Sequence, residues 1–504
     1  MTNFKEKLFQ NILDMNSISD RVEAALSQLN DNGYLVNPYL RIPKENKENL
    51  GKYKIAFKAK STATYLIVLF TIYPLFLFTF FLKILIRSVF FILTRKKIEV
   101  ENQEYFDNLV LTHFVRNNQF TKNSDPFFGG LITNLEQLNL KNICLYTNQM
   151  RKQPSRKLMK ELSKESIYLI PKLIPREYYL DYIVEVFRKS MKLLKVSIKG
   201  KLDKESNAFF YLIAAVKMFN RDTYVTYNLA RTLIIYVQKY KIQNVFMTFE
   251  GHSFEQLIVD ILKPHNVNVY LVQHSPITEN QKGVNYLLAS ADRYTNICVT
   301  GEIFVEYFIK HLKFNGNVFK IGTHKYRNNT NSDIDKSKII LFAPEGKLTN
   351  LISYIRFVLK LKKELTDYRI KIRIHPNLRV PFYIKLFLRI YESRDIFKIS
   401  EQSLESDLRE AEFVVYRSSA VGIESLFYFC VPIYLLEKNN EGGDALLNYQ
   451  GTKFCCSSTA DVVNALHLNK YDKNHHLSLG YLYFDKSNYT QLNNSLYGNL
   501  KSFG

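Results

Sequence analysis

The chain has 504 residues, of which 46% are hydrophobic and 23% charged, so it can bury the cores of two or three domains and is not a disordered protein. Its formal net charge of +22 predicts an anionic partner: nucleic acid, an anionic membrane or a phosphorylated substrate. The basic residues are spread along the chain without a clustered stripe or zinc-finger spacing, so we expect no nucleic-acid partner. Five cysteines in no disulfide or zinc spacing favour a reducing, cytosolic environment and no metal site.

The N-terminal part of the chain holds its longest apolar stretch. Residues 1–50 are predicted to form an amphipathic helical extension, and residues 51–98 an apolar helical segment that associates with a membrane. Residues 63–82 carry no charge, and a helix of that length matches the ~30 Å hydrocarbon core of a bilayer. Pro74 is expected to kink or break this helix, and both flanks are basic. A full span, a hairpin in one leaflet and an in-plane helix all fit; a buried core helix is the alternative without a membrane.

After this segment, short β-rich runs alternate with helical stretches in two blocks, which is typical of parallel sheets. No internal repeat is found, and residues around 291–302 are predicted to connect the blocks. The strands are predicted at residues 108–115, 141–148, 244–249 and 267–274 of the first block, and at 338–344, 368–376, 411–416 and 431–436 of the second. We therefore predict an α/β fold with two facing Rossmann-like domains, 99–299 and 300–470, and a cleft between them. Residues 471–504 are predicted to be helical and to pack back on the first domain.

Polar residues follow two strands of the first block, at the edge where open α/β sheets bind ligands. Glu250, Gly251 and His252 stand between a strand and a helix, and His274 ends the next strand. For Glu250 the alternative is a carboxylate that the helix dipole stabilises, and for His252 a role near the helix cap is preferred.

Two strands of the second block end in a similar way. His375 and Pro376 follow one strand, and Ser418, Ser419 and Gly422 lie where another strand turns into a helix. A helix N-terminus offers unpaired N–H groups and a partial positive charge to a phosphate, and the serines would add hydroxyl donors, although plain helix capping is the alternative. Together with the histidine, this grouping predicts a nucleotide mono- or diphosphate pocket.

Two further residues are secondary candidates. Lys325 follows a predicted strand of the second block and is a candidate for binding a phosphate or a carboxylated sugar, with a solvated basic turn as the alternative. Glu345 lies at another strand end and is predicted to border the base or ribose of a bound nucleotide.

These motifs resemble a known group of enzymes. "RIHP" (373–376) followed by "YRSSAVGIESLFYFCVPIYL" (416–435) resembles the donor-binding half of GT-B glycosyltransferases that build bacterial surface polysaccharides. The nearest groups are the polysialyltransferases, the capsule Kdo transferases and the teichoic-acid glycerophosphotransferases. "TFEGHSFEQLIVDILK", "VYLVQHSPI" and the early "DPFFGGLITNLEQLNLKNICLYT" are similar to turns of their first half, and the resemblance spans roughly residues 105–490 as a pattern of short motifs.

The resemblance implies roles for the candidate residues. His375 would contact the donor phosphate or cytidine, Ser418 and Ser419 would hold the phosphate, and Glu250 or His274 would be the general base. No DxD carboxylate pair stands at a strand end, so we expect transfer with inversion and without a metal or other cofactor.

The sequence thus predicts a membrane-associated glycosyltransferase at the cytoplasmic face of the inner membrane. The expected partners are a nucleotide sugar, a CMP-sugar being favoured, a polysaccharide or lipid-linked acceptor, and an anionic membrane surface. The first domain would bind the acceptor and the second the nucleotide sugar. A polyol-phosphate transferase of the CDP-glycerol type and a non-catalytic membrane scaffold with a GT-B fold are the alternatives.

Overall fold

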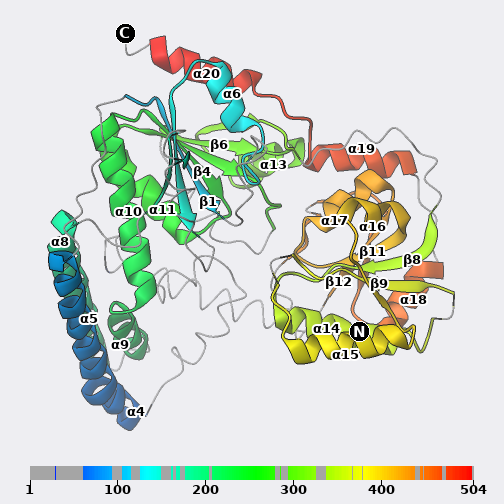
Figure 1. Ribbon diagram of the computed structural model, residues 1–504, viewed down its shortest axis with the longest axis horizontal. Helices are drawn as coiled ribbons and strands as arrows, with labels where there is room; N and C mark the ends of the chain where they lie inside the picture. The colour runs from blue at the N-terminus through cyan, green and yellow to red at the C-terminus, as the bar shows by residue number, and fades with distance from the viewer. Residues whose placement is uncertain are drawn as a thin grey trace. The chain divides into compact units, whose positions relative to one another are not determined.

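The chain forms two compact units in the computed structural model shown in Figure 1. The first contains residues 1–272, 281–298 and 314–318, and the second contains residues 273–280, 299–313 and 319–504. The structure describes residues 29, 61–93, 105–114, 125–148, 161–162, 166–170, 176–203, 207–278, 284, 293–324, 336–365, 367–376, 378–436, 443–446, 448–467 and 473–501. The extension predicted over residues 1–50 and the candidate Lys325 lie outside the described residues, apart from Leu29.

A seven-stranded sheet with the order β3-β2-β1-β4-β5-β6-β7 forms the core of the first unit, and its pairs β3–β2, β2–β1, β1–β4 and β5–β6 are parallel. The four strands predicted in this block are confirmed, and the sheet has three more: β3, which was not predicted, β6, whose residues we expected in a connection, and β7, which we assigned to the second block. Short apolar runs that begin with polar residues carry little alternation, which is why β6 was missed. The strands are β1 (Asn108–Phe114), β2 (Asn142–Asn148), β3 (Ile167–Leu169), β4 (Asn244–Phe249), β5 (Asn268–Gln273), β6 (Thr295–Val299) and β7 (Asn317–Lys320).

Asparagine side chains connect these strands where they begin. The Asn108 Nδ2 group donates to Asn142 Oδ1 at 2.8 Å, Asn244 Nδ2 donates to Asn108 Oδ1 at 3.0 Å, and Asn268 Nδ2 donates to Asn244 Oδ1 at 3.1 Å. A matching amide–amide bond of 2.9 Å joins β7 to β6. We call these side chains the asparagine ladder. It satisfies buried amides and lies at the sheet edge opposite to the carboxyl ends of the strands.

Helices cover the first sheet and build a second apolar cluster beside it. The helices are α6 (Leu131–Gln137), α8 (Arg176–Leu202), α9 (Ala208–Lys217), α10 (Arg221–Tyr240) and α11 (Ser253–Leu262), which a 3₁₀ turn, η4 (Lys263–His265), follows. Aromatic side chains dominate the cluster. Tyr182 of α8 packs edge-on against Tyr224 and Tyr227 of α10, with ring centroids 5.2 Å apart in both cases.

The predicted apolar segment is one long helix at the periphery of the first unit (Figure 1, blue). It consists of α4 (Thr62–Ile67), a π-helical turn η3 (Val68–Ile72) and α5 (Tyr73–Leu93). Pro74 does not break it, because the π-helical turn just before the proline shifts the hydrogen-bond register and the Thr71 hydroxyl donates to the Ile67 carbonyl. Among the described residues, Thr62–Ile86 is the one helix long and apolar enough to cross a bilayer.

A six-stranded sheet with the order β10-β9-β8-β11-β12-β13 forms the core of the second unit, and its strand pairs are parallel. All four strands predicted in this block are present. The strands are β8 (Ser337–Phe342), β9 (Arg369–Ile372), β10 (Lys398–Ile399), β11 (Ala411–Tyr416), β12 (Val431–Leu435) and β13 (Phe454–Cys456). The α/β fold class of two parallel sheets with alternating helices is therefore confirmed, whereas the facing arrangement and its cleft stay predictions.

The helical segments of the second unit lie before, between and after these strands in the chain. They are α13 (Glu302–Glu306), η5 (Tyr307–His311), α14 (Leu348–Leu361), α15 (Phe382–Ser393), α16 (Leu404–Glu410), α17 (Val421–Glu424), η6 (Ser425–Tyr428), α18 (Thr459–His467), α19 (Lys473–Tyr483) and α20 (Thr490–Lys501). The segment between α19 and α20 is bonded to the residues that follow β6 and β7. The Asp485 N–H donates to the Thr300 carbonyl at 2.8 Å, and the Asn488 N–H donates to the Ile321 carbonyl at 3.0 Å.

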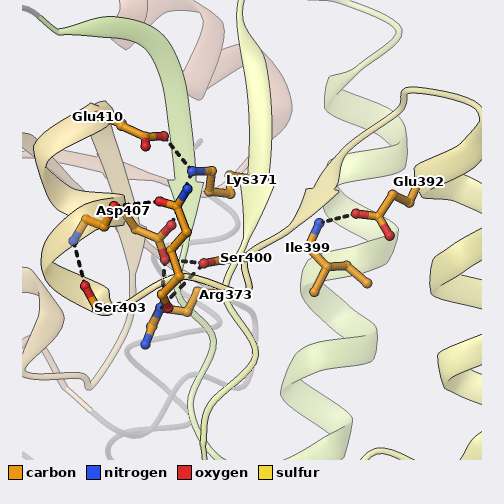
Figure 2. A network of polar contacts seen from close by, with 10 residues as sticks. Lys371, Arg373, Glu392, Ile399, Ser400, Ser403, Asp407 and Glu410 are labelled. Atoms are coloured by element: carbon orange, nitrogen blue, oxygen red, sulfur yellow. Dashed lines mark hydrogen bonds and ion pairs between the residues drawn. The ribbon is translucent and has the colours of Figure 1, made fainter.

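A buried carboxylate connects α16 to the carboxyl end of β9 (Figure 2). Asp407 is fully buried. Its carboxylate lies 3.3 Å from Nζ of Lys371, which is in β9, and 2.8 Å from Nη1 of Arg373, which directly follows β9. The Ser400 hydroxyl donates to the same carboxylate, and Lys371 also pairs with Glu410 at 2.7 Å. Two cations and a hydroxyl thus compensate the burial of one charge.

Candidate functional site

The loops after three neighbouring strands of the six-stranded sheet converge on Glu345. The Ser418 N–H, after β11, donates to Glu345 Oε1 at 3.3 Å, and Asn350 Nδ2 donates to Glu345 Oε2 at 3.0 Å. His375, after β9, lies against the same loop, since a Cβ atom on Gly346 would be 3.1 Å from His375 Nδ1. The structure therefore brings the predicted His375 and Ser418 to one edge, with Glu345 between them, because β8 separates β9 from β11.

His375 is held as a half-buried imidazole beside this carboxylate. Burial lowers its pKa below the ordinary value of 6.5; Glu345 opposes the shift and Arg373 adds to it. The Leu378 N–H donates to the His375 carbonyl at 2.9 Å, which fixes the turn that contains the exposed Pro376. At neutral pH this side chain is an uncharged N–H donor with one acceptor nitrogen.

Both serine hydroxyls already have hydrogen-bond partners, Ser418 in the segment after β12 and Ser419 within its own loop. Ser418 Oγ donates to the Gly443 carbonyl at 3.1 Å, and Ser419 Oγ accepts from the Val421 N–H at 3.3 Å, which is a capping contact. The helix that follows is short, since α17 (Val421–Glu424) has four residues and continues as the 3₁₀ turn η6. So short a helix contributes little macrodipole, and any phosphate binding here must depend on side chains and local N–H groups.

Gly422 of α17 leaves room for the last residue of the preceding strand. A Cβ atom at this position would lie 2.5 Å from Cε2 of Tyr416, the buried last residue of β11. The Tyr416 hydroxyl donates to Asp444 Oδ1 at 2.7 Å, and Lys453 Nζ lies 2.6 Å from Asp444 Oδ2. This chain of contacts positions residues 443–446, whose Gly443 carbonyl accepts from Ser418.

Arg417 is a residue of this edge that the sequence analysis missed. It is 3% exposed, its guanidinium carbon lies 4.6 Å from the Tyr354 ring centroid, and its Nη2 donates to Ser353 Oγ at 3.4 Å. A buried cation next to the serines raises the potential at the strand end, which favours an anion there. The basic residue directly before the paired serines was the available signal.

The turn after β4 presents Glu250 and His252 as a pair. Glu250 Oε2 and His252 Nε2 are 3.0 Å apart, and both side chains are about one-third exposed. Gly251, between them, has φ +78°, a left-handed conformation that a glycine adopts without strain. The structure therefore brings these three predicted residues together in one turn.

Glu255 of α11 is hydrogen-bonded to the backbone of this turn, and the sequence analysis did not predict a role for it. It is fully buried, and its carboxyl group accepts from the N–H groups of Glu250 at 3.2 Å and His252 at 2.8 Å, as in a capping box. Burial raises the pKa of Glu255 to about 8; His252 opposes this shift and Glu250 adds to it. The carboxyl group is thus protonated at neutral pH.

A second polar group lies at the ends of β1 and β2. The His113 ring contacts Thr147 Oγ1 through Nδ1 and lies 3.3 Å from Thr248 Oγ1 through Nε2. Asp125 is buried beside it, accepting from the Tyr146 hydroxyl at 3.1 Å and from the Phe127 N–H at 2.8 Å. The rule that the first strand of a doubly wound sheet is central would have drawn attention to His113.

The remaining predicted residues fall into two groups. His274 directly follows β5, the neighbour of β4, and is half-buried next to Gln273, whose Nε2 donates to the Ser275 carbonyl at 3.1 Å. The strand before the candidate Lys325 is β7, which belongs to the seven-stranded sheet and not to the second block as expected. Across the residues that the structure describes, no group of three or more His, Cys, Asp or Glu side chains could hold a metal ion.

Comparison with known proteins adds a likeness in fold. No family model and no curated protein matches the chain. Solved structures that resemble it include a Staphylococcus aureus MnaA–UDP co-structure (14% identity, 78% of this chain and 97% of that one, TM-score 0.47). Others are a UDP-GlcNAc 2-epimerase of Methanocaldococcus jannaschii (12%, 79% and 100%, TM-score 0.45) and a glycosyltransferase of Rickettsia africae (12%, 80% and 98%, TM-score 0.40). These identities and TM-scores are too low to carry an argument about activity.

The residues at the two sheet edges have complementary chemistry. The edge around Glu345 offers a carboxylate that accepts from the Ser418 N–H and the Asn350 amide, an uncharged imidazole N–H and a buried cation, which suit the ribose and phosphate of a nucleotide. The turn after β4 offers a carboxylate–imidazole pair that is about one-third exposed, which suits the removal of a proton from a hydroxyl group.

Proposed function

We propose that the chain is a membrane-associated, inverting glycosyltransferase that uses a nucleotide-activated sugar. The donor is a CMP-sugar in preference to other nucleotide sugars, and the acceptor is a surface polysaccharide or a lipid-linked glycan. The observation that carries the proposal is the convergence of Glu345, His375 and Ser418 at the carboxyl ends of β8, β9 and β11. Such edges are where doubly wound sheets bind nucleotides.

The donor would be held through its ribose and its phosphate. In this proposal the Glu345 carboxylate accepts from ribose hydroxyl groups, and the His375 N–H and the Ser419 hydroxyl donate to the phosphate. The Ser418 hydroxyl would also donate to the phosphate by turning away from the Gly443 carbonyl. Because His375 is uncharged at neutral pH, it binds the phosphate as a hydrogen-bond donor, and the positive potential comes from Arg417. The departing nucleotide is stabilised by these contacts, and no metal is required.

The acceptor hydroxyl would lose its proton to Glu250 or to His274. Glu250 has the stronger structural support, since His252 is 3.0 Å away and Glu255 fixes the turn through two backbone N–H groups. A carboxylate held by an imidazole in this way keeps one orientation toward an approaching hydroxyl. The apolar helix of residues 62–93 would keep the enzyme at the cytoplasmic face of the membrane that carries the acceptor.

A nucleotide-binding screen tests the donor half. CMP, CDP, UDP and GDP are each added to the purified protein, and the rise in melting temperature is measured for the wild type, His375→Ala and the matched control His467→Ala, an exposed histidine of α18. We expect one nucleotide to stabilise the wild type and the control. Loss of one hydrogen bond to a charged phosphate should weaken binding to His375→Ala by roughly 10- to 100-fold. If no nucleotide shifts the wild type, the scaffold alternative replaces the enzyme.

An activity assay tests the acceptor half and the choice of donor. Release of CMP from CMP-sialic acid and CMP-Kdo, and transfer of glycerol phosphate from CDP-glycerol, are measured with membranes of the cells that make the protein. Glu250→Gln should lower the turnover by roughly 10²- to 10⁴-fold and leave nucleotide affinity unchanged. Glu306→Gln, at an exposed glutamate of α13, is the control. Turnover with CDP-glycerol alone would favour the polyol-phosphate alternative, and an unaffected Glu250→Gln would leave His274 as the base.

A further inference from the structure

The long apolar helix is fastened along its length to α8, and the two helices run antiparallel. The Tyr65 hydroxyl is 2.9 Å from Ser197 Oγ, and the Tyr73 hydroxyl is 3.2 Å from Ser190 Oγ. Further along, Phe80 packs against Tyr182 near the start of α8, with ring centroids 6.1 Å apart. Among the described residues, these contacts bury one face of the apolar helix, while most of the large side chains of its other face are exposed.

The outward face of this helix is apolar and exposed. Phe70 is 70% exposed, Phe78 65% and Leu85 62%, values far above those of core side chains. The first charged residue along the helix is Lys83. A contiguous apolar surface of this kind marks a binding site for another apolar phase.

Helix α8 extends this surface with an exposed apolar stripe of its own. The stripe follows the helical repeat through Leu180, Val184, Phe187, Ile198 and Leu202. Phe187 joins it to the apolar helix, because its ring centroid lies 6.4 Å from that of Phe81, which is also exposed. The two stripes therefore form one surface.

A basic stripe borders the apolar stripe of α8. Arg188, Lys195 and Lys199 are exposed, follow one another at helical spacing, and lie beside Val184 and Ile198 on the same side of the helix. The combination of an apolar face with a neighbouring row of cations is the signature of a helix that lies in the interface of an anionic membrane.

The same charges argue against a full crossing of the bilayer. Because α8 lies along the apolar helix from Tyr65 to Phe80, insertion of that helix across the membrane would draw Arg188, Lys195 and Lys199 into hydrocarbon. Each such charge carries a cost of a few kcal/mol near the bilayer centre. Helix α8 also has a nearly buried Lys189, paired with Glu185 at 3.2 Å, that would have to enter with it.

We propose that the exposed faces of α4–α5 and α8 form one membrane-binding surface, which lies in the plane of a single leaflet and takes anionic lipids. The apolar stripes reach the upper acyl chains, and Arg188, Lys195 and Lys199 contact the headgroups. This inference rests on the membrane association of the proposed function, and it assigns the orientation and the lipid charge, neither of which the apolar sequence defines.

The chain contains no tryptophan, so a single introduced tryptophan reports its own depth in a membrane. Phe70→Trp, Phe78→Trp and Leu85→Trp sample α4–α5, and Leu180→Trp and Ile198→Trp sample α8. Each full-length variant is bound to vesicles that contain lipids brominated either near the headgroup or near the chain end. We expect all five tryptophans to be quenched mainly by the shallow bromines and to similar extents.

Flotation with vesicles tests the lipid charge. The protein should bind vesicles of phosphatidylcholine mixed with phosphatidylglycerol better than vesicles of phosphatidylcholine alone. The double variant Lys195→Gln/Lys199→Gln should lose roughly 30-fold in partitioning to the anionic vesicles only. Ile198→Asp should weaken binding to both kinds of vesicle, and Ile309→Asp, at an exposed isoleucine of the second unit, should not.

Different failures have different meanings. If the wild type does not float, membrane association itself is wrong, and with it this inference. If it floats but Phe78→Trp is quenched deeply while the α8 tryptophans are not quenched, the helix spans the bilayer and the in-plane surface is refuted. If no tryptophan is quenched and the apparent mass rises with protein concentration, the surface binds a second copy of the chain instead.

Discussion

The buried carboxyl group of Glu255 makes the stability of the first unit depend on pH. Its pKa is about 8 in the folded chain, against an ordinary value of 4.5, because burial disfavours the charged form. Between these two values the folded state holds a proton that the unfolded state has released. The stabilisation is therefore complete below pH 4.5 and is lost as the pH rises toward 8.

The magnitude follows from the size of the pKa shift. One proton changes the free energy of unfolding by about 1.36 kcal/mol per pH unit, so the change over the interval is at most about 5 kcal/mol. Glu255→Gln keeps the shape of the side chain and an oxygen that accepts from the backbone, but it has no proton to release. Relative to this variant, the wild type should lose stability steadily from pH 5 to pH 8.

Urea unfolding of both proteins at several pH values measures this difference. Other titrating groups cancel when the free energy of the variant is subtracted from that of the wild type, provided that the turn keeps its structure. A difference that stays within about 1 kcal/mol from pH 5 to pH 8 would show that Glu255 is already ionised in the folded state.

Two further substitutions probe the second unit by urea unfolding. Gly422→Ala should lower the free energy of unfolding by about 1–3 kcal/mol, since the new methyl group meets the Tyr416 ring at 2.5 Å; an unchanged stability would mean that the ring has room to move. Asp407→Asn should lower the free energy of unfolding by about 3–5 kcal/mol, because Lys371 and Arg373 lose the buried carboxylate between them. Glu410→Gln, at the exposed partner of Lys371, should lower it by less than about 1 kcal/mol. Equal losses for these two variants would contradict the burial argument.

Much of the sheet framework could be predicted from the sequence. Runs such as 244–249 and 411–416 are apolar, rich in β-branched and aromatic residues, and flanked by polar turns, and both strands occur as expected. The helix predicted after Ser419 is present but short. Its residues are apolar enough for a longer helix, but Phe429 adopts φ +57° and the Tyr416 ring occupies the space beside Gly422. Such tertiary limits are not visible in periodicity.

The candidate site was predictable in its residue types but not in its centre. Chain order placed His375 and Ser418 on successive strands, whereas the sheet order inserts β8 between them and makes Glu345 the meeting point. The first strand of each doubly wound sheet is central, and applying that rule to both blocks would have drawn attention to Glu345 and to His113. Arg417 and Glu255 could not be found in this way, because their roles depend on burial.

The asparagine ladder has a consequence for how the first sheet reaches its final strand order. Every interior amide serves one neighbour as donor and the other as acceptor, so a strand that enters out of place or slips by one residue leaves buried amides unsatisfied on both sides. The asparagine ladder thus disfavours a wrong strand order or register when the sheet assembles. The ladder lies where the strands begin, whereas the loops that would meet a substrate follow their carboxyl ends. The sequence of those loops can therefore change without affecting the ladder.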